Sequence, residues 1–159
     1  MSIVVNTDFK GEYNVSKNCY DQIDFYIEKY EKKYLTKLLG AELYALFIAD
    51  LDPLSFPRVP QTQRFLDIFN EFSIDENNYC LIESEGMRKM LIQLIYFHYV
   101  RENQVVNSAT GTVSSSVELG LNASFKGNIV QAFNEGVDNS YAIQWFICDN
   151  PTVYPEENI

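Results

Sequence analysis

The sequence of 159 residues has a single histidine, His98, and only three cysteines, Cys19, Cys80 and Cys148. A histidine-based catalytic triad or metal site would have to centre on His98, which lies in an apolar and aromatic stretch without a His-x-x-x-His or His-Glu motif. The cysteines are odd in number and lack CxxC spacing, which indicates neither a zinc site nor a disulfide framework. We therefore expect a reducing cytoplasm, a structural role for His98 beside the core, and no catalytic residue, metal or cofactor.

Basic residues are also scarce, because 12 Lys and Arg stand against 22 Asp and Glu and give a formal net charge of −10. This excess of negative charge opposes binding to phosphate backbones, which depends on Lys and Arg displacing counterions. The imbalance is steepest from Glu102 onward, where Lys126 is the single base. An acidic half of this kind can repel nucleic acid or meet a basic partner.

Long hydrophobic runs are absent. No stretch approaches the roughly 18 apolar residues of a membrane span, and residues 1–5 lack the basic start and apolar run of a signal peptide. We therefore expect no membrane contact. The 47% hydrophobic content over this length predicts one domain with its own core, and the 14% aromatic content supplies large groups that suit cores and interfaces alike.

Two charged motifs have competing interpretations. Asp50-x-Asp52 could hold a cation, but it lacks the third oxygen ligand and the glycine of a calcium loop, which favours capping at a helix end. A basic cluster could contact DNA, but Glu28 lies four residues before Lys32, and this favours a solvated helix face. The cluster consists of Lys29, Lys32, Lys33 and Lys37.

Apolar residues recur at helical spacing in five segments, which predicts a mainly α fold, a compact bundle of about five helices with extended N- and C-terminal arms. Gly40 should end the first helix, and Gly136 should kink or break the last. The last helix carries the stripe Ile129, Phe133, Val137, Tyr141 and Trp145. The expected helices span residues 21–39, 41–51, 61–72, 79–104 and 123–148.

The remaining segments predict how the domain is organised. Residues 1–18 show no helical period and are interpreted as an N-terminal arm, and residues 19–149 as the helical domain. Within it, residues 105–120 are β-prone around Thr110-Gly111, which predicts a variable, hairpin-like loop. Residues 150–159 contain two prolines and are interpreted as an extended docking tail. We expect both ends to be mobile in the free subunit and ordered on neighbouring proteins.

The order and spacing of several sequence blocks carry a resemblance to a known family. The main block runs from residues 25–31 through Tyr34-Leu35 to residues 38–44. Further similarity lies in residues 8–11, residues 96–99, Asn107, Thr110-Gly111, Phe133-Asn134 and Tyr154-Pro155. The chain resembles the head-to-tail connector proteins of tailed bacteriophages, particularly those of crAss-like and related Bacteroides phages, over nearly its whole length.

The resemblance implies a structural virion protein that is made in the host cytoplasm and forms a homo-oligomeric ring, commonly of twelve copies, in the neck of the particle. Its partners would be the portal protein and the next tail or ring protein, with DNA passing through without specific binding. A non-viral cytoplasmic helical adaptor remains an alternative, and an enzyme would need a cleft of perturbed titratable groups. The implied interface residues are Asp8, Phe9, Tyr30, Tyr34, Asn107, Thr110, Val153, Tyr154 and Pro155.

Overall fold

The fold is known from a computed structural model that describes residues 2–76, 80–103, 105–108, 111–114 and 119–154, with side chains described except at 76, 80 and 105–128. Five helices pack together into a compact, mainly helical body, as the sequence predicts. Among the described residues, no helix is both long enough and apolar enough to cross a bilayer.

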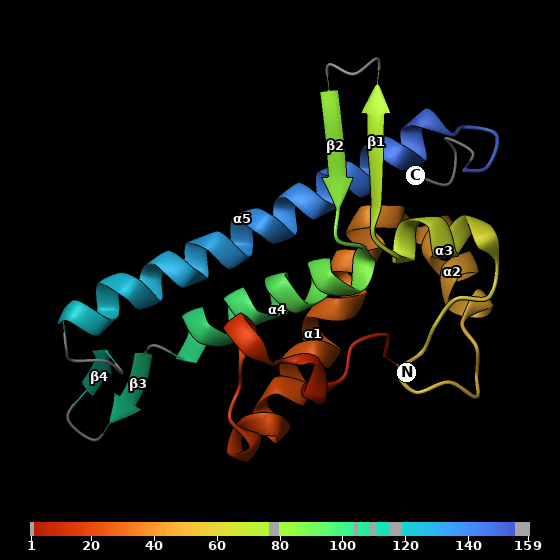
Figure 1. Ribbon diagram of the computed structural model, residues 1–159. Helices are drawn as coiled ribbons and strands as arrows, with labels where there is room; N and C mark the ends of the chain where they lie inside the picture. Colours follow the sequence, from red (N-terminus) through yellow and green to blue (C-terminus); the bar gives the residue numbers. More distant parts are fainter. Residues whose placement is uncertain (1, 77–79, 104, 109–110, 115–118, 155–159) are drawn as a thin grey trace.

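The chain begins with three 3₁₀ turns and then alternates helices with two antiparallel hairpins (Figure 1). The 3₁₀ turns are η1 (Asn6–Asp8), η2 (Gly11–Tyr13) and η3 (Lys17–Cys19). The helices are α1 (Tyr20–Leu39), α2 (Ala41–Asp50), α3 (Gln63–Phe69), α4 (Met87–Asn103) and α5 (Leu119–Asp149). The strands are β1 (Phe72–Glu76), β2 (Cys80–Ser84), β3 (Val105–Ser108) and β4 (Gly111–Ser114).

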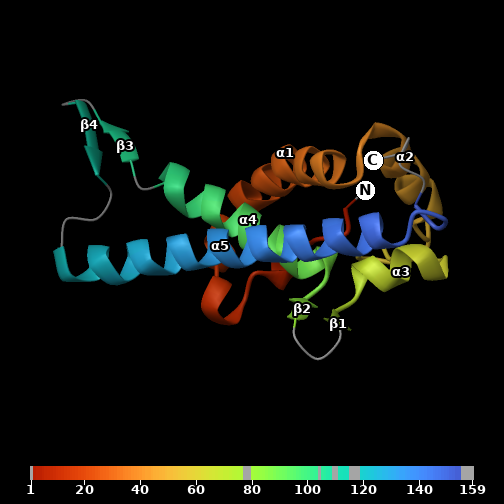
Figure 2. The ribbon, with the colours of Figure 1, turned by 90° about the horizontal axis from the view of Figure 1, so that it is seen from above.

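Helix α4 is the centre of the body. It buries Met90, Leu91 and Ile95 together with seven further residues on its other sides, which confirms the central helix that the sequence predicts. Helix α5 runs along it, and α1 packs on its other side, as the view from above makes plain (Figure 2). Gly40, with a φ of 78° that disfavours a Cβ atom, separates α1 from α2 at the predicted position.

Helix α5 continues without a break through Gly136, and the predicted kink is wrong. A Cβ atom at Gly136 would lie only 2.7 Å from Cγ of Leu94, so this glycine lets α4 and α5 approach closely. The side of α5 that faces the core is accordingly lined by small or slender residues, Ala132, Gly136, Asn139, Ile143 and Ile147. Of the predicted stripe, Ile129 is buried in the core, whereas Tyr141 and Trp145 are 65% and 48% exposed.

The β1–β2 hairpin replaces the end of one predicted helix and the beginning of another. The third helix was expected to reach residue 72 and the fourth to begin at residue 79, but residues 72–76 pair with residues 80–84 in antiparallel register. The segment follows a period of two: Phe72 and Ile74 are half-buried while Ser73 and Asp75 are exposed. Gly86, with a φ of 94°, then turns the chain into α4.

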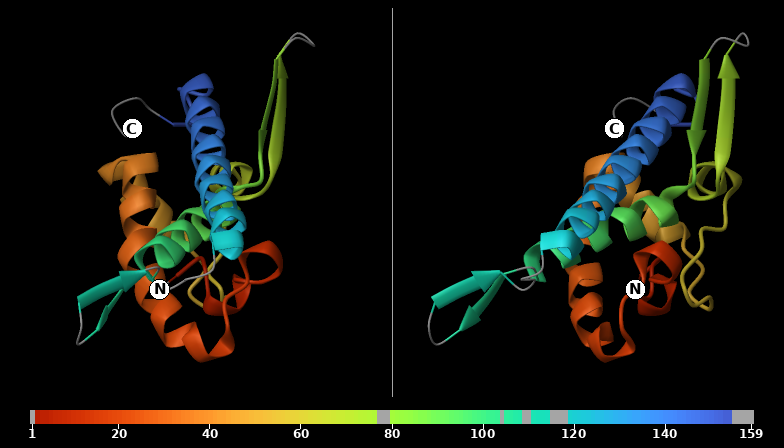
Figure 3. Two further views of the ribbon diagram at one scale, coloured as in Figure 1. Left: turned by 90° about the vertical axis from the view of Figure 1, so that its left-hand side faces the viewer. Right: turned by 60° about the vertical axis from the view of Figure 1, so that its left-hand side comes forward.

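The β3–β4 hairpin agrees with the predicted hairpin-like loop at residues 105–120. Asn107 pairs with Thr112 in its register, and Ser108 with Gly111. Both hairpins project from the helical body at different ends (Figure 3). Thr110 lies outside the described residues.

The N-terminal segment differs from the extended arm that the sequence predicts, because its apolar side chains are part of the core. Ile3, Val4 and Phe9 are at most 1% exposed. The backbone N–H of Ile3 donates to Oε1 of the buried Glu31 on α1 (2.7 Å), and Asp8 pairs with Arg88 on α4 (2.5 Å). Sequence reasoning missed this role because the segment has no regular period, although its apolar residues are frequent.

The C-terminal segment also differs from the predicted extended tail as far as Tyr154. After α5 the chain turns, with the N–H groups of Val153 and Tyr154 both donating to the carbonyl of Asn150. This turn places the Tyr154 ring in the core at 0% exposure, where its hydroxyl donates to the carbonyl of Arg64 on α3. Pro151 begins the turn rather than an extended strand, since its fixed φ is compatible with both.

Candidate functional site

An aromatic cluster around His98 joins α1 to α4. The imidazole of His98 stacks on the ring of Tyr30, with 3.9 Å between centroids and 9° between planes. Its Nε2 forms a hydrogen bond with the hydroxyl of Tyr34, and the hydroxyl of Tyr30 donates to Glu102 one turn further along α4. The spacing of Tyr30 and Tyr34 puts both phenols on the side of α1 that faces His98.

The electrostatics of this cluster keep His98 neutral near pH 7. Burial and the nearby charge of Arg101 lower the pKa of His98 to about 4, and Glu102 opposes this only in part. Burial would raise the pKa of Glu102, but the hydrogen bonds from Tyr30 and Tyr26 outweigh it and lower that pKa. Nδ1 of His98 is buried without a hydrogen-bond partner, 3.8 Å from Glu102 Oε1.

This arrangement is suited to holding two helices together. The cluster contains a neutral imidazole and phenols whose pKa values burial raises, and it presents no Ser, Cys or Lys nucleophile among its members. Across the part of the chain that the structure describes, no three His, Cys, Asp or Glu side chains are grouped so that they could hold a metal ion. His98 is thus buried between α1 and α4, and its structural role stays a prediction.

A second polar network joins α4, α5 and the segment after β2. The side chain of Gln93 donates to Glu85 Oε2 (2.7 Å) and accepts from Nδ2 of Asn139 (2.8 Å). Asn139 in turn accepts from the backbone N–H of Glu85 (2.8 Å), and Glu135 accepts from the hydroxyl of Tyr13. Sequence reasoning missed this network, since its members are up to 122 residues apart and carry no motif. Its buried polar atoms fix the register between the helices.

Asp50 and Asp52 organise the loop between α2 and α3. Oδ2 of Asp50 accepts hydrogen bonds from the backbone N–H groups of Gln61 and Thr62, both at 2.9 Å, at the start of α3. Oδ1 of Asp52 accepts from the N–H of Leu54. The two carboxylates therefore hold the backbone of the loop, and the predicted capping of a helix end is not shown, because every N–H group that they accept lies outside α3 (Gln63–Phe69).

The predicted interface residues do not form one surface. Phe9, Tyr30 and Tyr154 are buried within the subunit, and Asp8 is held by Arg88, so none of them is a free contact for a partner. Tyr34 is half-buried, Val153 is 40% exposed, and Asn107 lies in β3, where its side chain is not described. Thr110 and Pro155 lie outside the described residues.

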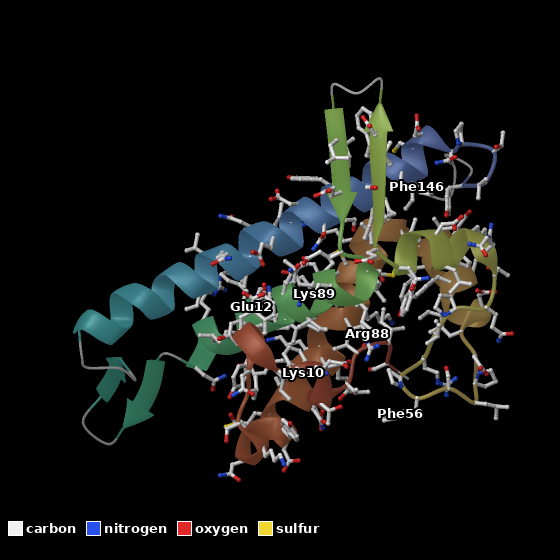
Figure 4. The ribbon with its side chains drawn as sticks, in the orientation of Figure 1. Lys10, Glu12, Phe56, Arg88, Lys89 and Phe146 are labelled. Carbon is white, nitrogen blue, oxygen red and sulfur yellow. The ribbon has the colours of Figure 1, made fainter. Side chains whose placement is uncertain are left out.

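The tip of the α2–α3 loop carries the most exposed large apolar side chains among those the structure describes. Leu54 is 92% exposed and Phe56 is 85% exposed, and Figure 4 shows Phe56 on the loop away from the helices. Because Asp50 and Asp52 fix both ends of this loop, the two side chains are presented on an ordered tip. Neither side chain stands out in the sequence, because each is a single apolar residue in a segment without helical or strand period.

Two charged surfaces lie on either side of α5. One is the acidic hollow, an open space of about 650 Å³ between the β1–β2 hairpin and α5, and none of its described lining residues is basic. The other is the lysine face of α1, whose four lysines are all exposed. The acidic residues that line this hollow are Glu71, Glu83, Glu85, Glu135 and Asp138. The lysine face consists of Lys29, Lys32, Lys33 and Lys37.

In comparisons with known proteins, no family model, no curated protein and no solved structure matches this chain. The structure itself shows a compact, mainly helical fold with two polar clusters between its helices.

Proposed function

We propose that this protein is a structural subunit of the connector between the head and the tail of a tailed bacteriophage. In this proposal it forms a homo-oligomeric ring below the portal protein, around the channel through which DNA leaves the capsid, and it has no catalytic role. The observation that carries the proposal is the ordered set of connector-like sequence blocks, which extends from residues 8–11 to Tyr154-Pro155.

The surface of the subunit supports this proposal. Exposed apolar side chains at the loop tip, Leu54 and Phe56, offer a compact contact for a neighbouring protein. The formal charge of −10 disfavours a strong hold on the phosphates of DNA, which suits a channel through which DNA must pass. In a ring, each small contact recurs at every subunit, so weak contacts add up to stable docking.

The predicted docking contact therefore moves from the C-terminal tail to the loop tip. Tyr154 cannot serve as a free anchor because its ring is buried in its own subunit. Leu54 and Phe56 replace it as candidates for contact with the portal. Val153, whose side chain is 40% exposed, offers a smaller contact area than either of them.

The test is electron microscopy of the purified protein mixed with its cognate portal protein. We expect rings of uniform diameter that are stacked on the portal. The double variant Leu54→Ser, Phe56→Ser should retain its melting temperature, since both side chains are already exposed, and should lose most of the docking. Leu46→Gln, a change at a 45% exposed position on α2, is the matched control and should dock normally.

Failure of the intact protein to form portal-bound rings would contradict the connector proposal. Normal docking of the double variant would leave the connector proposal in place but would show that the loop tip is not the portal contact. A stable monomer or twofold dimer that ignores the portal would favour the helical adaptor instead.

A further inference from the structure

The acidic hollow has carboxylates that form no ion pair with any residue whose side chain the structure describes. Glu85 and Glu135 accept hydrogen bonds from Gln93, Asn139 and Tyr13 and so belong to the internal network. Glu71 and Glu85 also line a neighbouring hollow together with the basic residues at positions 10, 88 and 89. Glu83 and Asp138 have no such neighbours: both are exposed and make no hydrogen bond or ion pair within the described residues.

The lysine face is the opposite kind of surface. Lys32 and Lys37 are exposed and form no ion pair among the described residues, while Lys29 lies 3.9 Å from Glu102 and Lys33 lies over the ring of Tyr30. Four cations on successive turns of one helix give a concentrated positive field in a protein that is acidic overall.

The two surfaces belong to elements on opposite sides of α5. The view from above shows α5 between α1 and the β1–β2 hairpin (Figure 2), and the end-on view shows the hairpin and α1 on opposite sides of α5 (Figure 3). Surfaces that lie on opposite sides of one subunit cannot pair across a twofold axis, but they can pair in a repeating head-to-tail order.

We propose that the acidic hollow of one copy binds the lysine face of α1 of the next copy, so that this protein assembles head to tail with itself. The contact deepens the proposed function and rests on it, because a head-to-tail contact closes into a ring when its rotation allows. The partner is a second copy rather than a metal ion or a nucleic acid, since the chain itself carries the complementary positive surface.

An apolar contact lies beside each charged surface. On the hairpin, Leu81 is 60% exposed and projects from the same strand face as Glu83. Next to the lysine face, a hollow of about 350 Å³ between α1, α4 and α5 is lined by apolar side chains together with the polar residues Lys37, Ser140 and Gln144. The apolar lining of this hollow comes from Leu38, Met90, Leu94, Phe133 and Val137. Leu81 of one copy fits this hollow of the next, which adds a desolvated anchor beside the ionic contact.

The proposed contact can be tested by reversing charges at residues that make no hydrogen bond or ion pair among the described residues. The hollow variant is Glu83→Lys with Asp138→Lys, and the lysine variant is Lys32→Glu with Lys37→Glu, because none of these residues holds the subunit together. The controls are Asp149→Lys and Lys17→Glu, which each reverse one charge of the same sign at an exposed position away from both surfaces, and so make half the charge change of the corresponding double variant. Circular dichroism should show that all four proteins keep the helical fold.

Sedimentation of the purified proteins at low ionic strength is the test. The wild-type protein and both controls should associate, and added salt should weaken the association because exposed charges are screened. Each charge-reversal variant alone should dissociate at least about tenfold more readily, since like charges then meet across the contact. An equimolar mixture of the two variants should regain association, because the reversed hollow then meets the reversed helix.

Recovery in the mixture cannot come from a general loss of negative charge, and it would establish the contact. Association of each variant alone at wild-type strength, no recovery in the mixture, or a wild-type protein that stays monomeric would each overturn it. If the wild-type protein and each charge-reversal variant all form portal-bound rings, this contact is wrong and the connector proposal stands. If the wild-type protein associates head to tail but does not bind the portal, the contact stands and the connector proposal is wrong.

Discussion

The imidazole of His98 lies flat against the phenol of Tyr30, and the same imidazole is hydrogen-bonded to Tyr34 one turn further along α1. This stack connects the first helix of the body to the central one. It also removes from water the only side chain of the protein whose ordinary pKa lies near neutrality.

The first prediction concerns the pH dependence of stability. Burial and Arg101 lower the pKa of His98 to about 4 from an ordinary 6.5, so between these values the unfolded chain binds a proton that the native protein does not. The contribution of His98 is therefore complete above pH 6.5 and falls as the pH is lowered toward 4, by about 1–3 kcal/mol. The charged groups around it, Lys29 and Lys33 on α1 and Arg101 and Glu102 on α4, set the remaining local field.

The measurement is urea unfolding of the wild-type protein and His98→Gln at several pH values. Carboxylates also titrate in this range, but they do so in both proteins. The difference in free energy of unfolding between the two proteins should be constant above pH 7 and should shrink as the pH falls. A difference that does not change with pH would show that His98 is accessible to protons in the native state.

The second prediction concerns Glu31, the buried carboxylate that accepts the N–H of Ile3. Glu31→Ala leaves that N–H without its partner and should cost about 1–3 kcal/mol in free energy of unfolding. Glu31→Gln keeps an acceptor oxygen in place and removes a charge whose pKa burial raises, so it should cost less than about 1 kcal/mol.

Hydrogen exchange at the Ile3 amide and limited proteolysis are the direct measurements. Residues 3–15 should resist proteolysis in the wild-type protein and become sensitive in Glu31→Ala. Rapid cleavage of this segment in the wild-type protein would restore the interpretation of residues 1–18 as a free arm.

The helices that could be predicted from the sequence are those determined by local pattern. The first two begin and end within about a residue of prediction, because Ile23 and Ile27 mark one face and Gly40 ends the helix by its positive φ. The β1–β2 hairpin could not be predicted in the same way. Short apolar runs fit either period, and the choice here depends on contacts with α5, such as Phe72 against Phe146.

The residues of the candidate site also differ in whether sequence neighbours or distant contacts determine their surroundings. The burial of His98 and the exposure of the lysine cluster follow from neighbours in sequence. The burial of Phe9 and Tyr154, and the pairing of Gln93 with Asn139, depend on which distant elements come together. For a tyrosine near the end of a chain, the sequence alone is compatible with a docking residue and with a core residue, and only its surroundings decide between them.

The third prediction separates two kinds of glycine requirement. Gly86 and Gly11 both have positive φ, but a Cβ atom at Gly86 would lie 2.5 Å from the carbonyl oxygen of Phe69, whereas nothing lies within 4 Å at Gly11. Gly11→Ala should therefore cost only the backbone strain, about 1–2 kcal/mol. Gly86→Ala should cost more than this by at least about 1 kcal/mol, because the backbone at residues 69 and 70 must move.

Thermal and urea unfolding of the two variants provide the comparison. Both should keep the helical circular dichroism spectrum, and Gly86→Ala should have the lower melting temperature. Equal losses would indicate that the close approach between the start of α4 and the end of α3 can relax without cost.

The fourth prediction concerns Tyr154, whose ring is fully buried and whose hydroxyl donates to the carbonyl of Arg64. Tyr154→Ala should lower the free energy of unfolding by about 3–5 kcal/mol, as for other large aromatic truncations in a core, whereas Tyr154→Phe should lose only about 1 kcal/mol with its hydrogen bond. Val153→Ala, at a partly exposed neighbouring position, is the control and should be nearly neutral. Urea unfolding measures all three. A Tyr154→Ala protein as stable as the wild type would place this ring outside the core and would return the C-terminal segment to the role of a docking tail.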